Sequence, residues 1–202
     1  MAIMPSAGKE FEIVKSGRHK GRLVRIIDLG TQKGEYEGNI TYKHKALLMW
    51  ELPETEITEG EFEGKPFFVS LFATVSLHEA SILGPLLVGW RGKEFTDKEK
   101  AEFNLLELLG KTFDINVIHK ESDGKIKARV HQLSPLEEED CPARVNDLVA
   151  FDLSEFNQEV FDSLSDKIKD IIMKSPEYKI RNDENKGDIA VAEKQLEEES
   201  PF

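Results

Sequence analysis

Apolar and β-branched residues are concentrated in separate short stretches of the chain, which predicts a mainly β protein. The stretch Gly21–Gly30 ("GRLVRIIDLG") is apolar and bounded by glycines, as is typical of a buried strand. Ile40–Leu52 begins with alternation and ends in an apolar run, so we expect a strand that Pro53 ends. Lys65–Leu77 is aromatic and β-branched and predicts a third strand. The polar, glycine-containing segment 31–39 is expected to be a loop.

The pattern changes after the third predicted strand. Apolar residues at helical spacing predict short helical turns that Gly84-Pro85 interrupts and that end near Gly92. Thr96 is a candidate N-cap for the next turn. Two alternating runs then flank Ser122-Asp123-Gly124, which is a hairpin signal. Three strands, a helical connection and a two-stranded hairpin form the element order of the five-stranded oligonucleotide-binding (OB) barrel, so the predicted fold is mainly β with accessory helices.

The last third of the chain has a different composition. The segment after Pro135 is acidic and irregular, and Asn157–Ser175 has the apolar spacing of an amphipathic helix that we expect to pack on the barrel. From Arg181 onward nothing in the sequence can build a core, which predicts a disordered acidic tail. The predicted organisation is an OB-fold nucleic-acid-binding domain at 1–135, an acidic linker and C-terminal helix at 136–180, and a flexible tail at 181–202.

Charge is distributed unevenly along these 202 residues, whose formal net charge is -12. Segment 15–45 holds eight basic and three acidic residues, whereas 181–202 holds three basic and seven acidic ones. A basic stretch of this kind favours a polyanionic ligand in spite of the acidic total. Cys141 is the only cysteine, so the chain cannot form an internal disulfide. We find no secretory signal and no apolar run of the roughly 18 residues that a membrane span needs, so we expect a cytoplasmic protein, in the host cell if phage-encoded, without a membrane partner.

Motifs for catalysis are not found. The five histidines lie outside any HExxH or Cys-x-x-Cys pattern, and neither a phosphate-binding loop nor a GxSxG elbow is present. Ser76, His78 and Glu79 lie close together in the sequence, which could indicate acid–base chemistry, but a helix-capping box explains the same spacing. We therefore expect no enzyme activity, no catalytic residues, no metal site and no cofactor.

Basic and aromatic side chains on the first three strands favour a binding function. Proteins that bind single-stranded nucleic acid combine a basic groove with aromatic rings on which bases stack. The loop between the first two predicted strands and the loop between the last two, with lysines behind it, would flank the binding face of an OB barrel. Strand aromatics are more often core residues than ligand platforms, and we include two of them. The candidate DNA-binding residues are Lys20, Arg22, Arg25, Lys33, Tyr36, Tyr42, Lys43, Lys45, Trp50, Phe68, Lys125 and Lys127.

The final residues "EEESPF" suggest a docking peptide, because an exposed terminal Phe buries nothing within its own chain. A flexible acidic tail could also occupy a basic groove of the same molecule at high effective concentration. The candidate docking tip consists of Glu197, Glu198, Glu199, Pro201 and Phe202.

This ending resembles the C-terminal tip of bacterial and phage single-stranded DNA-binding proteins, which end in an acidic run and a Phe. The body, with "DLGTQKGEYEG", "LLMWELP", "VSLHEASIL", "WRGKEFT" and "IMKSPEY", resembles a group of phage proteins over about Gly21 to Tyr178. The resemblance implies an OB-fold, single-stranded DNA as ligand, a role in phage DNA replication or recombination, and partner proteins recruited through the tip.

Three alternatives to a single-stranded DNA-binding protein stay open. The chain could be an OB-fold adaptor that binds a protein or RNA and uses its tip as the docking peptide. It could be a nucleic-acid-processing enzyme without a recognisable motif, or an acidic DNA mimic. The sequence also allows a homodimer.

Overall fold

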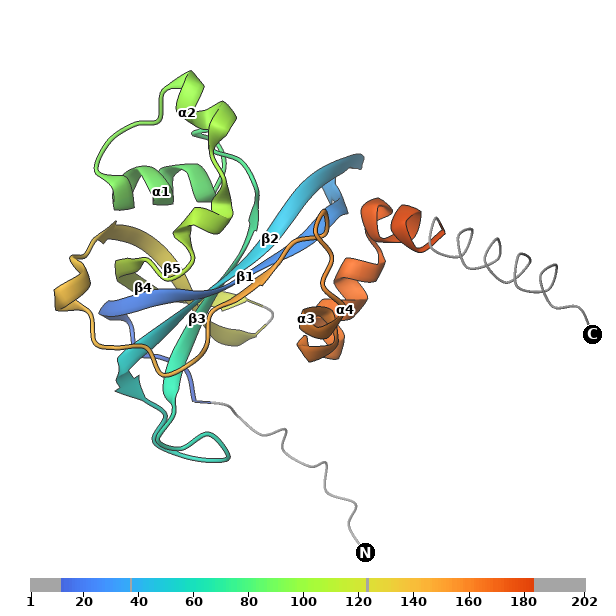
Figure 1. Ribbon diagram of the computed structural model, residues 1–202. Coiled ribbons are helices and arrows are strands. Elements are labelled where there is room, and N and C mark those ends of the chain that lie inside the picture. The colour runs from blue at the N-terminus through green and yellow to red at the C-terminus, as the bar shows by residue number, and fades with distance from the viewer. Residues whose placement is uncertain (1–11, 37, 123, 184–202) are drawn as a thin grey trace, which may run out of the picture.

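The fold is built on a curved, mainly antiparallel sheet of six strands, shown in the computed structural model of Figure 1. The structure describes residues 12–36, 38–122 and 124–183. The strands are β1 (Gly17–Tyr36), β2 (Asn39–Glu56), β3 (Pro66–Thr74), β4 (Thr112–Ser122), β5 (Lys125–Pro135) and β6 (Val149–Phe151). The strand order is β3-β2-β1-β4-β5, and β6 pairs with β1 in parallel. The edge strands β3 and β5 contact each other, but no ladder joins them in the described part of the chain, so the sheet is not closed.

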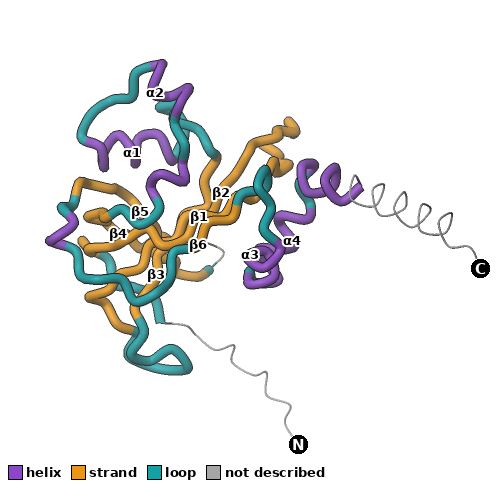
Figure 2. The backbone as a smooth tube through the Cα atoms, in the orientation of Figure 1, coloured by secondary structure: helices purple, strands orange, loops and turns teal. Residues whose placement is uncertain are grey.

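Short helices lie on two sides of this sheet (Figure 2). They are α1 (Leu83–Arg91), α2 (Asp97–Glu102), the 3-10 turns η1 (Leu105–Leu108) and η2 (Glu138–Asp140), α3 (Gln158–Ser163) and α4 (Asp166–Met173). The first three form the connection between β3 and β4, and the last two follow β6. The fold is therefore mainly β with accessory helices. After α4 the chain is helical again over 176–183. The predicted acidic tail lies outside the described residues except for 181–183.

Strands β1 and β2 extend beyond the sheet as a two-stranded arm, Thr31–Tyr36 paired with Asn39–His44 (Figure 1). The prediction of a loop over 31–39 was therefore wrong. Most of the arm's side chains are exposed on both of its faces, so its sequence lacks the apolar alternation that marks a half-buried strand. Pro53 does not end β2 either; the ladder to β3 has an irregularity between Leu52 and Glu56 instead.

The inner face of the sheet holds the larger core. Even-numbered residues of β2 point inward, and Trp50, at 0% exposure, packs against Phe113 with ring centroids 5.8 Å apart. On β3 Phe67 is buried and Phe68 is half-buried, as the strict alternation of a strand requires. The consequence is that residues such as Arg25, Leu47, Phe68 and Phe72 belong to the outer face.

A second core lies on that outer face. Ile27 and Leu47 of the sheet pack with Phe161, Leu164 and Ile172 from the helices that follow β6. The single helix predicted over 157–175 is two helices, because the chain leaves helical geometry at Leu164 and Ser165 before α4 begins. These helices cover β1 and β2 but leave β3 bare, as the low exposure of Leu47 and the 48% exposure of Phe72 show.

Local signals in the connection are confirmed in part. Thr96 caps α2 and forms a reciprocal capping box with Glu99. Gly92, with φ 74°, ends α1. Pro85 does not interrupt the helix, because it lies in the first turn, where a missing backbone N–H costs nothing. The predicted hairpin is present, with Ser122 paired to Lys125.

Gly30 allows the sheet and the C-terminal helices to approach closely, which gives a test of this packing. Its φ is 66°, and an added Cβ would lie 2.6 Å from the Ser175 Cβ. We expect Gly30→Ala to lower the free energy of unfolding by about 3 kcal/mol, from backbone strain and overpacking together. Gly38→Ala, with φ 78° but no atom within 4 Å of its Cβ, should cost only about 1 kcal/mol. Equal losses in urea unfolding would contradict the close packing at Gly30.

Candidate nucleic-acid interface

The outer face of the sheet is hollowed where the helical layer stops. One cavity of about 320 Å³ lies between the sheet and the start of α4. Its lining residues are Arg25, Ile27, Leu47, Met49, Ser70, Phe72, Leu164, Ser165 and Ile168. A second cavity of about 240 Å³ lies between β3, β5 and the segment 12–14, and its lining includes Phe68, Ser70, Lys127 and Glu12. Because Ser70 lines both, the two cavities adjoin on β3, and we call them together the β3 groove.

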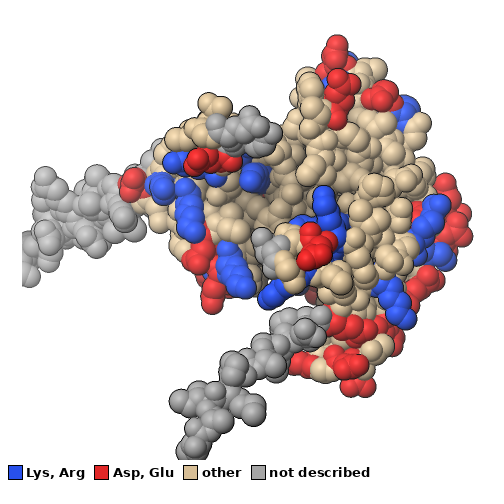
Figure 3. Space-filling view, turned by 180° about the vertical axis from the view of Figure 1, so that it is seen from behind, with Lys and Arg blue, Asp and Glu red and all other residues tan. Residues whose placement is uncertain are grey.

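Figure 3 shows the molecule from the side opposite to Figure 1. The surface is hollowed between the part that carries the C-terminus and the body of the sheet, and the hollow is mostly uncharged. Lys and Arg side chains lie along its borders, together with some Asp and Glu side chains. An apolar floor with cations at its rim is suited to a ligand that has both flat apolar rings and negative charge.

Arg25 supplies the cation within the groove. It is half-buried and forms no hydrogen bond or ion pair with any described residue, and its Nε is buried without a partner. By contrast, Arg18, Arg91 and Arg144 each pair with a carboxylate. Partly removing a guanidinium from water without a counter-charge is unfavourable, so Arg25 favours an anion in the groove.

Two rings of β3 lie on the same face as Arg25. Phe72, near the end of β3, is 48% exposed, and Phe68 is half-buried at the other end of the groove. Their spacing of four residues places both on the outer side of β3 with Ser70 between them. Exposed flat rings of this kind can stack on nucleobases.

The hairpin β4–β5 adds basic residues beside the groove. Lys127 lines the second cavity, Lys120 is its cross-strand partner, and Arg129 follows two residues later on the same face of β5. Neither Lys120 nor Arg129 forms an ion pair within the described residues, and Lys125 is exposed next to the hairpin turn. These cations stand where the hairpin forms one side of the groove.

Three residues predicted from the sequence line this groove, and others lie on the same face of the sheet. Arg25, Phe68 and Lys127 line its cavities. Lys43 and Lys45 lie on the same side of β2 as Leu47, because they alternate with the inward-facing His44 and Ala46. The outer face thus unites Arg25, Lys43, Lys45, Phe68 and Lys127, with Lys125 at the end of the hairpin.

Two other candidates cannot contact a ligand in this structure, and their assignment to the site was wrong. Trp50 has no exposed surface and is a core residue. Arg22 is 9% exposed, and its Nη1 donates to the Gly110 carbonyl and to Glu138 Oε1 at 2.7 Å. Its counter-charge comes from a residue far along the chain, which the local sequence around Arg22 does not show.

The remaining candidates lie elsewhere. Lys20 is exposed and faces Glu54, at 3.5 Å. Lys33 and Tyr42 are cross-strand neighbours on the arm, on the face opposite to Lys43, so they do not share the groove with it. Tyr36 is the last residue of β1, at the end of the arm. The docking tip, Glu197, Glu198, Glu199, Pro201 and Phe202, lies outside the described residues.

Sequence reasoning missed the residues that complete the groove: Ser70, Phe72, Ser165, Ile168, Lys120 and Arg129. For Phe72 the signal was available, since it has the same parity along β3 as Phe68. For Ser165 and Ile168 the sequence holds no such signal, because their position depends on how α4 packs against the sheet.

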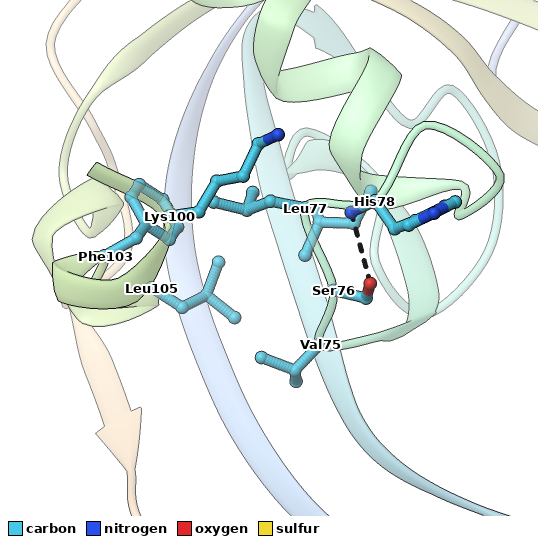
Figure 4. A pocket seen from close by; sticks show the side chains of 8 residues that line it. Val75, Ser76, Leu77, His78, Lys100, Phe103 and Leu105 are labelled. Carbon is cyan, nitrogen blue, oxygen red and sulfur yellow. Dashed lines mark hydrogen bonds between the residues drawn. The ribbon is translucent and has the colours of Figure 1, made fainter. Parts of the chain in front are cut away.

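The opposite, inner side of the arm borders an apolar cleft. Figure 4 shows part of it, with Val75, Leu77, Phe103 and Leu105 around an opening that Lys100 and His78 flank. Here Ser76 Oγ accepts a hydrogen bond from the His78 backbone N–H, whereas His78 Nδ1 accepts from Ala80 N. Ser76 and the imidazole are thus each engaged in a local turn. The expected capping box at Ser76 was wrong, because α1 begins only at Leu83.

A cluster of polar side chains fastens the base of the arm to the C-terminal helices. His44 Nε2 lies 2.7 Å from Asp28 Oδ1, and its Nδ1 lies 3.8 Å from Glu177. Glu177 accepts hydrogen bonds from the hydroxyl and backbone N–H of Thr31. The hydrogen bond to Asp28 raises the pKa of His44 above its ordinary value, and the negative charges of Asp28, Glu177 and Asp152 add to this. Burial disfavours the charged form of Glu177, but the Thr31 hydrogen bonds outweigh it and lower the pKa of Glu177.

Within the described ranges no group of three or more His, Cys, Asp or Glu side chains could hold a metal ion. In the same part of the chain, no helix has the length and apolar character required to cross a membrane.

Comparison with known proteins does not assign the chain to a family. No protein-family model matches the sequence, and no curated protein matches it.

The arm fastening predicts a pH-dependent stability. A group whose pKa is raised in the folded state stabilises the fold fully below its unfolded pKa, about 6.5 for His, and loses this effect as pH rises through the folded value. We therefore expect His44→Gln to lower the free energy of unfolding at pH 6 by up to about 1 kcal/mol, since the pair is partly exposed, and by less at pH 9. The measurement is urea unfolding at both pH values.

His131→Gln serves as the control, because His131 is exposed and forms no hydrogen bond with described residues. A loss at His44 that is the same at pH 6 and pH 9 would contradict the ionic fastening.

Proposed function

We propose that this chain is a sequence-tolerant single-stranded DNA-binding protein that holds its ligand in the β3 groove. Basic side chains at the rim neutralise phosphates, and the rings of Phe68 and Phe72 stack on bases. No step of chemistry is required of the protein, so the proposal is a binding function and not an enzyme activity.

The observation that carries this proposal is that Arg25, which has no partner among the described residues, lines the same cavity as the exposed ring of Phe72. An anion alone would satisfy the guanidinium but not the half-exposed ring, and an apolar ligand alone would leave the cation without a partner. A nucleotide offers a phosphate and a flat base a few ångströms apart, so it suits both groups together.

We further propose that the sheet is an OB-fold whose barrel lacks a ladder between β3 and β5. The support is the order β3-β2-β1-β4-β5, in which β1 pairs with both β2 and β4. The groove crosses β3 on the outer face, between the arm and the β4–β5 hairpin, where OB-folds receive oligonucleotides. This agrees with the resemblance to phage single-stranded DNA-binding proteins and with a role in DNA replication or recombination.

The acidic tail has a place in this proposal as a regulator. Residues 197–202 would compete with DNA for the basic groove and, when displaced, would recruit replication or recombination proteins. Deleting 194–202 is then expected to tighten DNA binding and to abolish recruitment.

Fluorescence titration with poly-dT at two salt concentrations tests the proposed function. If about four cations contact phosphates, the affinity should fall about 50-fold between 50 and 200 mM salt, since each contact to a single strand adds roughly 0.7 to the slope of log K against log salt. Absence of binding at 50 mM salt would remove the proposal and favour the adaptor function.

Arg25→Gln tests whether Arg25 contacts a phosphate of the bound strand. We expect it to lower the affinity for poly-dT several-fold and to reduce the salt slope by about 0.7, because one phosphate contact is lost. Arg144→Gln is the matched control: it makes the same charge change at an exposed Arg that pairs with Asp147 and does not line the groove. Equal effects of the two substitutions would mean that only net charge matters and that Arg25 has no specific contact.

A further inference from the structure

The β3 groove is not uniform along its length. At β3 it is open, with Phe72 and the exposed Ser70 on a bare strand. Towards β1 it deepens into the cavity of about 320 Å³, where the sheet residues Ile27, Leu47 and Met49 form one wall and Leu164, Ser165 and Ile168 form the other. The groove therefore runs from an open platform into a pocket that the start of α4 covers.

The pocket exists because the helical layer is smaller than the sheet face that it covers. Leu164 and Ile172 belong to the second core, whereas Met49 and Ile168, which pack against it, are only partly buried. Apolar surface that stays exposed where the helical layer stops costs roughly 25 cal/mol per Å² relative to burial. A ligand that covers this surface gains that free energy.

The pocket lining combines apolar walls with a few polar groups. The walls are apolar, the ring of Phe72 stands at the entrance, and the polar groups are the Arg25 guanidinium and the hydroxyls of Ser70 and Ser165. The Ser165 side chain is the N-cap of α4 but makes no capping hydrogen bond, and neither hydroxyl has a hydrogen-bond partner among the described residues. These features fit a flat heterocycle with polar edges better than an aliphatic chain.

We infer that this pocket takes one unpaired nucleobase of the bound strand, with Phe72 at its entrance and Arg25 on the adjoining phosphate. This inference rests on the proposed function and deepens it. A base can enter the pocket only if its pairing edge is free, so the pocket selects single strands over duplex. It also gives the strand one anchored base, whereas neighbouring bases lie on the open platform.

The test compares two ligands of equal charge, an oligothymidylate of about ten residues and an abasic oligodeoxyribose phosphate of the same length. Ser165→Phe adds a ring at an exposed residue that lines the pocket, without changing charge and, because Ser165 makes no capping bond, without removing one. We expect it to weaken oligothymidylate binding roughly 5- to 150-fold, the range for losing one stacked base, and to leave binding of the abasic ligand unchanged. Ser163→Phe, the same change at an exposed position of α3 that does not line the pocket, removes the hydrogen bond from the Ser163 hydroxyl to the Val160 carbonyl but should alter the binding of neither ligand.

Ile168→Trp, at a half-buried position of α4 that lines the pocket, provides a second pocket-filling variant in case Ser165→Phe impairs folding, which circular dichroism would reveal. It should show the same selective loss for oligothymidylate. Unchanged oligothymidylate binding in the folded variants would overturn the inference that the pocket takes a nucleobase. This result is expected if the pocket instead receives a side chain of another protein. Equal weakening of the binding of both ligands would overturn the inference as well. Either result leaves the proposed function in place, provided that the unaltered protein binds oligothymidylate in a salt-dependent way; absence of that binding is the failure of the function itself.

Discussion

The outer face of the sheet is covered only in part, and the candidate function depends on where that cover ends. Ile27 and Leu47 lie beneath the helices that follow β6, whereas Phe72, on the neighbouring strand, is 48% exposed. If the helical layer reached β3, the rings and Arg25 would be core residues. If it were absent, the second core would be open to water. The partial cover leaves a groove with an apolar floor, which is the condition for a ligand that stacks.

Fixed contacts hold the helical layer in this position. Glu177 accepts two hydrogen bonds from Thr31, the Gln32 side chain donates to the Ile171 carbonyl, and Gly30 lets the chain near Ser175 come within van der Waals distance of β1. These contacts lie at the base of the arm. The arm and the wall of the groove are thus fastened at one place. Lys43 of the arm and Lys45 at its base are the cross-strand partners of Gln32 and Gly30, so these contacts help to fix their positions.

The sequence predicted what local patterns determine. Apolar alternation located the cores of β1 to β5, Ser122-Asp123-Gly124 located the hairpin, and Thr96 located the start of α2. It could not predict the arm, whose two faces are both exposed. Nor could it separate paired cations from free ones: Arg22 and Arg25 lie three residues apart in one basic stretch, yet Glu138 neutralises the former and no described residue neutralises the latter. Such differences depend on contacts between residues distant in sequence.

The most direct test of the account is to map DNA contacts by NMR, following backbone amide shifts while an oligothymidylate of about ten residues is added. The account predicts that the largest changes fall on 68–74, 43–49, 125–129 and 164–168, which surround the β3 groove. Small changes are expected at Val75–His78 and Phe103–Leu105, which line the cleft on the other side. Changes concentrated at that cleft, or spread evenly over the surface, would contradict the β3 groove as the binding site.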